Sequence, residues 1–195
     1  VYEAVSHPPT DDSPASRAQR AAALVALVVH KYAPLPAASL TYLVRLLGYG
    51  APHLAPQIQT ALRLAKQELA SCQINGTTWY WPADENPASR RHTPDGAVRL
   101  LAPFDPVVWD RRRFTLLWDW TYKFEAYTPA PQRKLGYYAL PLLWHDRVIG
   151  WANVTAPQGH MVVNFGYADK APQGADFRAA LDDELQRMAY FLAAH

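Results

Sequence analysis

Apolar residues recur at helical spacing in the first part of the chain. From 17 to 32 they suit a helix buried over much of its circumference, and Ser16 precedes this segment as the expected N-cap. A second apolar face runs from 37 to 47 and is followed by Gly48, a residue that commonly ends helices. Two consecutive helices are therefore predicted.

A third helix is expected to begin after Pro52 or Pro56 and to run to about Ala70. Its apolar residues form one stripe at i, i+4, i+7 and i+11: Ile58, Leu62, Ala65 and Leu69. The other face is polar and carries Gln59, Arg63, Lys66 and Gln67. This helix is therefore predicted to be amphipathic.

A hairpin is predicted directly after the third helix. Two short β-prone runs, 72–74 and 77–81, flank the dipeptide Asn75-Gly76, which favours a tight hairpin turn. Three helices closed by a hairpin is the order of a winged-helix domain. In such a domain the third helix enters the major groove of double-stranded DNA.

If the third helix reads DNA, the residues expected to contact base edges are Gln59, Arg63 and Lys66. The alternative is that this face is an ordinary solvated helix surface and that the winged helix serves as a packing module. The residues alone leave both interpretations open.

The second half of the chain predicts an α+β fold. A helix is expected from 106 to 118, and an amphipathic helix from 175 to 193 should cover a sheet. Between them, four consecutive strands predict an antiparallel β-meander or open barrel: 122–127, 137–144, 148–155 and 161–167. The expected domain organisation is a linker 1–16, a winged-helix domain 17–83, a linker 84–96 and an α+β domain 97–195.

Charge and composition exclude several function classes. The chain has 19 Lys and Arg against 17 Asp and Glu, so any DNA-binding surface must be local rather than a property of the net charge of +2. One cysteine, Cys72, excludes an internal disulfide framework, and the seven histidines show no metal-ligand spacing. Nucleophile-elbow, P-loop and dinucleotide signatures are absent. We expect no cofactor, no metal and no membrane partner.

Three consecutive arginines, Arg111, Arg112 and Arg113, are the leading candidates for phosphate contacts. On a helix, successive residues are rotated by about 100°, so the three cannot all face one ligand. One or two are expected to contact DNA, and at least one is expected to pair internally. The candidate internal partners are the carboxylates Asp105, Asp110 and Glu125.

Two cations in a later loop, Arg133 and Lys134, are the second candidates for DNA contact. Ordinary solvated loop charge explains them equally well. Six aromatic residues downstream of the arginines are expected to lie mostly in the core or in the wall of a cleft: Trp118, Trp120, Tyr122, Phe124, Trp144 and Trp151.

The motifs PFDPVVWDRRR and QRKLGYYALPLLW carry a resemblance to a known family. The matching residues, in order, are Pro103, Asp105, Trp109, Asp110, Arg111, Arg113, Glu125, Tyr127, Arg133, Gly136, Tyr137, Tyr138, Pro141, Asp146, Arg147 and Gly150. Together with the preceding winged-helix pattern, they resemble the carboxy-terminal half of the YcaQ/AlkZ-type winged-helix DNA glycosylases. The resemblance covers nearly all of residues 17 to 152.

The resemblance implies a cytoplasmic DNA-repair enzyme. Family members hydrolyse the N-glycosidic bond of alkylated bases, including bases in interstrand crosslinks, and their partner is double-stranded DNA. Their catalytic Gln-x-Gln or Gln-x-Asp pair would lie upstream of the residues that match here. Since the chain begins at Val1 rather than Met, we expect it to be either a processed chain or a fragment of a longer protein.

The chain does contain one Gln-x-Gln pattern, Gln57-Ile58-Gln59, but it falls within the third expected helix, and we interpret it as a coincidence. No catalytic residue is therefore assigned, and whether this chain alone is an enzyme stays open. A transcription regulator, with a winged helix and a ligand-sensing or dimerisation domain, is the main alternative. A scaffold that has lost DNA contact is the third.

Overall fold

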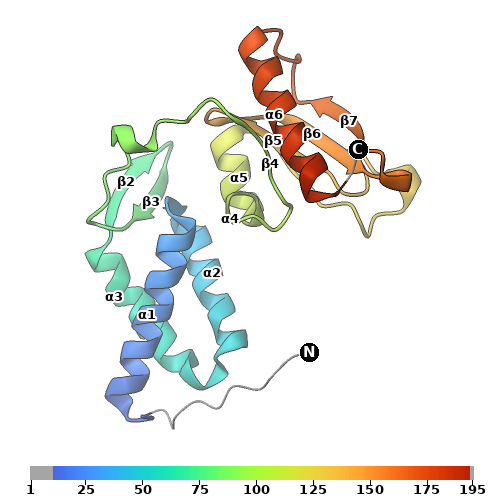
Figure 1. Ribbon diagram of the computed structural model, residues 1–195. Helices are drawn as coiled ribbons and strands as arrows, with labels where there is room; N and C mark the ends of the chain where they lie inside the picture. The colour runs from blue at the N-terminus through green and yellow to red at the C-terminus, as the bar shows by residue number, and fades with distance from the viewer. Residues whose placement is uncertain (1–10, 194–195) are drawn as a thin grey trace. The chain divides into compact units, whose positions relative to one another are not determined.

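The computed structural model describes residues 11–193 and divides the chain into two compact units, Val1–Asn86 and Pro87–His195 (Figure 1). Each unit contains its own antiparallel sheet, so the fold is α+β, as predicted. The expected linker 1–16 lies partly outside the described residues, and its last residues belong to the first helix.

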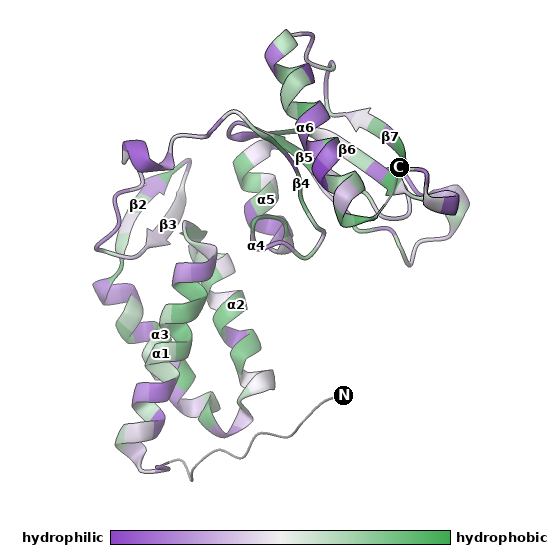
Figure 2. Cartoon of the chain, viewed as in Figure 1, coloured by the Kyte–Doolittle hydropathy of each residue, from purple (hydrophilic) through white to green (hydrophobic). Residues whose placement is uncertain are grey.

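The first unit contains three helices, as predicted, but the second continues through Gly48, which was expected to end it, as far as Gly50. They are α1 (Pro14–Tyr32), α2 (Ala37–Gly50) and α3 (Ala55–Glu68), with a 3₁₀ turn at Pro52–Leu54 before α3. Hydrophobic residues line the contacts between these helices (Figure 2) and form one buried core: Ala21, Val25, Val28, Val29, Leu35, Leu40, Leu43, Val44, Leu54, Ile58, Ala61 and Leu62.

The start of α1 corrects the predicted cap. Ser13, not Ser16, is the N-cap, because the Ser13 hydroxyl accepts the N–H of Ser16 at 3.2 Å. Pro14 follows as the first helical residue, where its fixed φ suits the helix and its missing N–H costs nothing. The helix therefore begins earlier than the apolar periodicity indicated.

A three-stranded sheet completes the first unit, in the order β1-β3-β2. The predicted hairpin is present as β2 (Ala70–Ile74) and β3 (Thr77–Trp81), and Asn75 and Gly76 both have positive φ, 49° and 74°, as a tight type I′ turn requires. The third strand, β1 (Leu35–Pro36), pairs with Tyr80 and Trp79 and is too short to give a sequence signal.

The second unit contains an open four-stranded antiparallel sheet, in the order β4-β5-β6-β7. Its strands are β4 (Val98–Leu100), β5 (Leu140–Trp144), β6 (Arg147–Thr155) and β7 (Val162–Tyr167). The antiparallel order is as predicted, but the first strand is not. Residues 122–127 form no strand, and β4 occupies that place in the sheet instead.

Tertiary contacts explain this error. The Tyr122 hydroxyl donates to the carbonyl oxygen of Ala139 at 2.7 Å, and Glu125 turns inward to accept backbone N–H groups. Both side chains are buried by these contacts rather than by strand pairing. The two buried positions are three residues apart and do not alternate, so the residue types predicted a strand that the backbone does not form.

The helix predicted over 106–118 is two helices, α4 (Pro106–Trp109) and α5 (Arg111–Trp118). Asp110 has extended backbone angles and interrupts the helix between them. The last helix, α6 (Ala175–Phe191), ends before the predicted Ala193.

Helices cover both faces of this sheet. Phe177 of α6 packs with Val98 and Leu142 in one buried cluster, while Val108 and Phe114 of α4 and α5 belong to another. Neighbouring strand residues point to opposite faces, and Leu142 and Leu143 accordingly belong to different clusters.

Candidate nucleic-acid interface

The polar face of α3 presents two of its three predicted DNA-reading side chains to solvent. Gln59 and Arg63 are exposed. Lys66 is partly buried, and its Nζ donates to the Thr41 hydroxyl on α2 at 3.1 Å. A contact from Lys66 to DNA would have to replace this bond, whereas Arg63 needs no such exchange.

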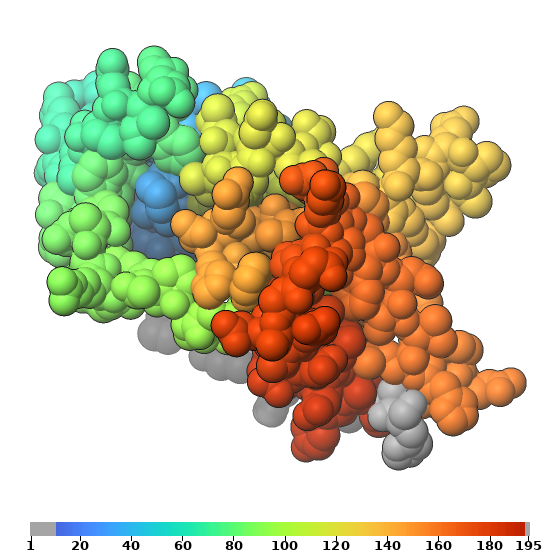
Figure 3. Space-filling view, turned by 90° about the horizontal axis from the view of Figure 1, so that it is seen from above, coloured from blue at the N-terminus to red at the C-terminus, as the bar shows by residue number. Residues whose placement is uncertain are grey.

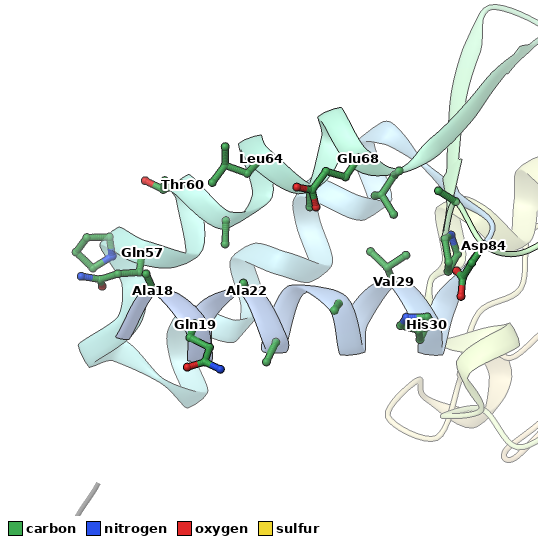
Figure 4. Close-up of a pocket in the computed structure, with 18 residues that line it drawn as sticks. Ala18, Gln19, Ala22, Val29, His30, Gln57, Thr60, Leu64, Glu68 and Asp84 are labelled. Carbon is green, nitrogen blue, oxygen red and sulfur yellow. The ribbon is translucent and has the colours of Figure 1, made fainter. Parts of the chain in front are cut away.

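An apolar groove lies between α1 and α3 in the same unit and has a volume of about 840 Å³ (Figure 4). Alanines of α1, including Ala18 and Ala22, form one wall, and Thr60 and Leu64 of α3 form the other. Its few polar groups are dispersed along its length, so the groove offers no converging set of catalytic side chains.

The Gln-x-Gln pattern of α3 does not form a shared site. Gln57 lines the groove and has a buried Oε1 without a hydrogen-bond partner among the described residues, while Gln59 is exposed. Side chains two residues apart on an α-helix are rotated by about 200°. The two amides therefore point in different directions, in keeping with a coincidental pattern.

In the second unit, Asp110 determines how the three arginines are presented. Its Oδ1 accepts the N–H of Arg113 at 3.3 Å, which makes Asp110 the N-cap of α5. Asp105 caps α4 in the same way by accepting the N–H of Val107 at 2.8 Å. The arginines therefore occupy the first turn of a new helix instead of the middle of a longer one.

The three arginines have different surroundings. Arg111 donates to the carbonyl oxygens of Pro103, at 2.9 Å, and of Val108, and its guanidinium lies 4.4 Å from the centre of the Tyr122 ring. Burial lowers the pKa of Arg111, and Tyr122 opposes this effect. Burial in turn raises the pKa of Tyr122 to about 12, against the opposing effect of Arg111.

Arg113 is only 4% exposed and donates to the carbonyl oxygen of Pro106 at 2.6 Å, whereas Arg112 is exposed. At least one of the three arginines was expected to pair with Asp105, Asp110 or Glu125; the hydrogen-bond acceptors of Arg111 are the backbone carbonyls of Pro103 and Val108. Of the three guanidiniums, Arg112 is the one that this conformation offers to a ligand.

The loop that carries the second pair of cations is held by Glu125. This carboxylate is 3% exposed, and its Oε2 accepts the N–H groups of Lys134, Leu135 and Gly136 at 2.8, 2.7 and 3.3 Å. Burial acts to raise the pKa of Glu125, but the three donors outweigh it and the pKa lies below its ordinary value of 4.5. The carboxylate therefore stays charged and fixes the loop.

Asn153 of β6 supports the same loop from the sheet. Its side-chain amide donates to the carbonyl oxygen of Leu135 at 2.7 Å and accepts the N–H of Tyr138 at 3.3 Å. Gly136 has a φ of +117°, and a Cβ there would overlap the Asn153 side chain. The loop conformation therefore requires glycine at this position.

Arg133 and Lys134 differ in exposure. Arg133 is partly buried, its Nε donates to the carbonyl oxygen of Thr128 at 2.8 Å, and its guanidinium lies 4.9 Å from the centre of the Tyr137 ring. Lys134 is exposed. The loop therefore presents one solvated cation and one that is already oriented against an aromatic ring.

Sequence reasoning missed an exposed group of aromatic side chains in this unit. We call it the aromatic ridge, and it consists of Phe104, Trp109, Phe124, Tyr127 and Tyr138. Of these residues, only Phe124 was expected to lie in the core or in a cleft wall, and no prediction of exposure was made for the other four. Their exposure depends on loop packing, for which the sequence carries no periodic signal.

Between residues 11 and 193, no group of three or more His, Cys, Asp or Glu side chains is arranged to hold a metal ion. Within the same residues, no helix is both long and apolar enough to cross a membrane.

Comparison with known proteins gives one family. A family model described as DNA glycosylase AlkZ-like matches residues 1–191. No solved structure matches the chain.

Proposed function

Because the chain belongs to the AlkZ-like DNA glycosylase family, we propose that it binds double-stranded DNA during the excision of alkylated or crosslinked bases by N-glycosidic bond hydrolysis. The family match over residues 1–191 is the observation that carries this proposal. DNA repair is the corresponding process. The cytoplasmic location implied by the resemblance stays a prediction.

Local cations support the proposed contact with DNA. Arg63 on α3 and Arg112 on α5 are exposed, as is Lys134 in the loop held by Glu125. Guanidinium and ammonium groups contact phosphates without reading sequence, so these residues would supply affinity. Gln59 and Arg63 are the exposed residues among those predicted to contact base edges, but we propose that they contact the DNA backbone, because excision of a lesion at any sequence requires no readout of neighbouring bases.

The buried arginines have a different proposed role. Arg111 and Arg113 hold the segment around α4 through bonds to the carbonyl oxygens of Pro103 and Pro106. We propose that they position Arg112 and do not themselves contact phosphate. Arg133 and Lys66 would reach DNA only after exchanging their present bonds with Thr128 and Thr41.

We assign no catalytic residue in this chain. In the resembling family, an amide pair would position the hydrolytic water and stabilise developing charge on the sugar. Gln57 and Gln59 do not converge, so we propose that this chain holds the duplex and that the water-positioning pair is not Gln57-Ile58-Gln59.

Duplex binding by this chain tests the proposal. We expect fluorescence anisotropy to detect binding of a labelled duplex, with equal affinity for several unrelated sequences. Unlabelled duplex of any sequence should compete. Absence of binding would contradict the proposal, and strong preference for one sequence would favour the transcription regulator instead.

Release of 7-methylguanine from a methylated duplex tests the catalytic assignment. The assay uses a protein that contains this chain and releases 7-methylguanine, and we expect Gln57→Ala and Gln59→Ala to leave its release rate unchanged. Loss of a measurable release rate in both variants would show that the pair is catalytic after all.

A further inference from the structure

The aromatic ridge is continuous and open to solvent. Ring centres are 5.8 Å apart for Phe104 and Trp109, 5.4 Å for Phe104 and Phe124, 6.2 Å for Phe124 and Tyr127, and 5.2 Å for Phe124 and Tyr138. Exposed fractions are 94% for Tyr127, 57% for Phe104, 40% for Tyr138 and 39% for Trp109. Four exposed rings therefore lie around the half-buried Phe124, and three of them contact it.

The ridge stands on backbone that is already fixed. Tyr127 follows Glu125, whose carboxylate holds the loop at Lys134–Gly136, and the N–H of Tyr138 is bonded to Asn153. Trp109 ends α4, directly before the cap residue Asp110. In Figure 3, the gold segment that follows α5 projects from the body of this unit. Little ordering is needed before a ligand could bind, which favours affinity.

Three exposed cations occur near ridge residues in the sequence. Lys123 directly precedes Phe124, Arg112 follows Trp109 by three residues, and Lys134 lies in the loop held by Glu125. The nearby carboxylates are used internally, because Glu125 accepts backbone N–H groups and Asp105 and Asp110 cap helices. Exposed aromatic faces flanked by cations favour a ligand that is both planar and anionic.

We propose that the aromatic ridge binds unpaired nucleotides of DNA by stacking their bases on its rings. Stacking on aromatic side chains and contact between cations and phosphates are the two interactions that bind single-stranded nucleic acid without sequence preference. The inference rests on the proposed function and narrows its substrate to DNA in which base pairing is locally open.

Replacement of Tyr127 separates stacking from charge. We expect Tyr127→Ala to weaken binding of a labelled single strand of about 12 nucleotides by about tenfold, because a stacked ring is lost. Tyr127→Phe should retain the affinity of the unsubstituted chain. The matched control is Tyr190→Ala on α6, which removes an equally exposed tyrosine, 90% exposed, that is outside the ridge. Circular dichroism should show that all three variants are folded.

A second measurement reports stacking directly. 2-Aminopurine at the unpaired position of a bulged duplex should lose fluorescence on binding to the unsubstituted chain and should lose much less on binding to Tyr127→Ala. Equal single-strand affinity and equal quenching in both proteins would overturn the inference.

The two proposals fail in different ways. If fully paired duplex is bound and Tyr127→Ala changes nothing, the ridge proposal fails and the proposed function stands. If paired duplex is not bound but Tyr127-dependent single-strand binding is present, the ridge proposal stands and duplex binding fails.

Discussion

At the scale of single residues, the central group of the second unit is Glu125. One buried carboxylate oxygen satisfies three successive backbone N–H groups and thereby fixes the loop that carries Arg133 and Lys134. The sequence offered Glu125 as an ion-pair partner of the arginines. The carboxylate acts instead on the backbone, because three converging N–H donors compensate its burial.

We expect Glu125→Gln to lower the free energy of unfolding by about 1–3 kcal/mol at neutral pH, since a neutral amide accepts these bonds more weakly. Urea unfolding measures the change. Asp183→Asn on the exposed face of α6 is the control and should change stability little.

The same variant should show the pH dependence of this site. The folded pKa of Glu125 lies below its ordinary value of 4.5, so its stabilising effect is present above 4.5 and is lost as the pH falls through the folded pKa. The stability difference between the unsubstituted chain and Glu125→Gln should shrink under these acidic conditions. A difference that stays constant would contradict this assignment.

At the scale of elements, short interruptions decide which side chains are exposed. Asp110 separates α4 from α5, and Arg113 then lies in the buried part of the first turn while Arg112 faces solvent. Helical spacing predicted that the arginines could not act together. Which of the three arginines is exposed to solvent depends on the residue at which α5 begins.

The pairing of β6 with β7 depends on the absence of a side chain at Gly150. A Cβ there would overlap the carbonyl oxygen of Gly166 and would lie 2.8 Å from the Cα of Tyr167. We expect Gly150→Ala to lower the free energy of unfolding by about 1–3 kcal/mol, because the strands must move apart.

Thermal and urea unfolding measure this loss. Gly48→Ala in α2 is the control, since a Cβ there meets nothing within 4 Å, and it should stabilise the helix by about 0.5–1 kcal/mol. Equal effects of the two substitutions would contradict the close strand contact.

At the scale of the whole molecule, the net charge of +2 is too small to explain DNA binding. The proposed binding would instead depend on exposed cations at particular places, and Arg63 on α3 and Arg112 on α5 are two such cations. The slope of log K against log salt concentration reports the number of these contacts, because each phosphate contact releases condensed counterions.

We expect Arg63→Gln and Arg112→Gln each to reduce the slope of log K against log salt concentration by about 0.9 for a paired duplex. Arg178→Gln on α6 removes an exposed arginine outside both surfaces and should leave the slope unchanged. If all three variants show the same salt slope as the unsubstituted chain, neither Arg63 nor Arg112 belongs to the proposed interface.

The sequence by itself determined the helices of the first unit, its Asn75-Gly76 hairpin, the antiparallel sheet of the second unit and the family. Each of these depends on local patterns: helical periodicity, turn chemistry and alternation along strands. The family motif from Pro103 to Gly150 could likewise be recognised from the amino-acid sequence without a structure.

Only the tertiary structure decided which side chains are available. Residues 122–127 were predicted to form a strand, but Tyr122 and Glu125 are buried by contacts with a later segment of the chain, and burial from such contacts leaves no period in the sequence. For the same reason the sequence did not show that Arg113 is buried or that four rings of the aromatic ridge are exposed. Exposure depends on packing between distant segments, and local sequence patterns do not encode that packing.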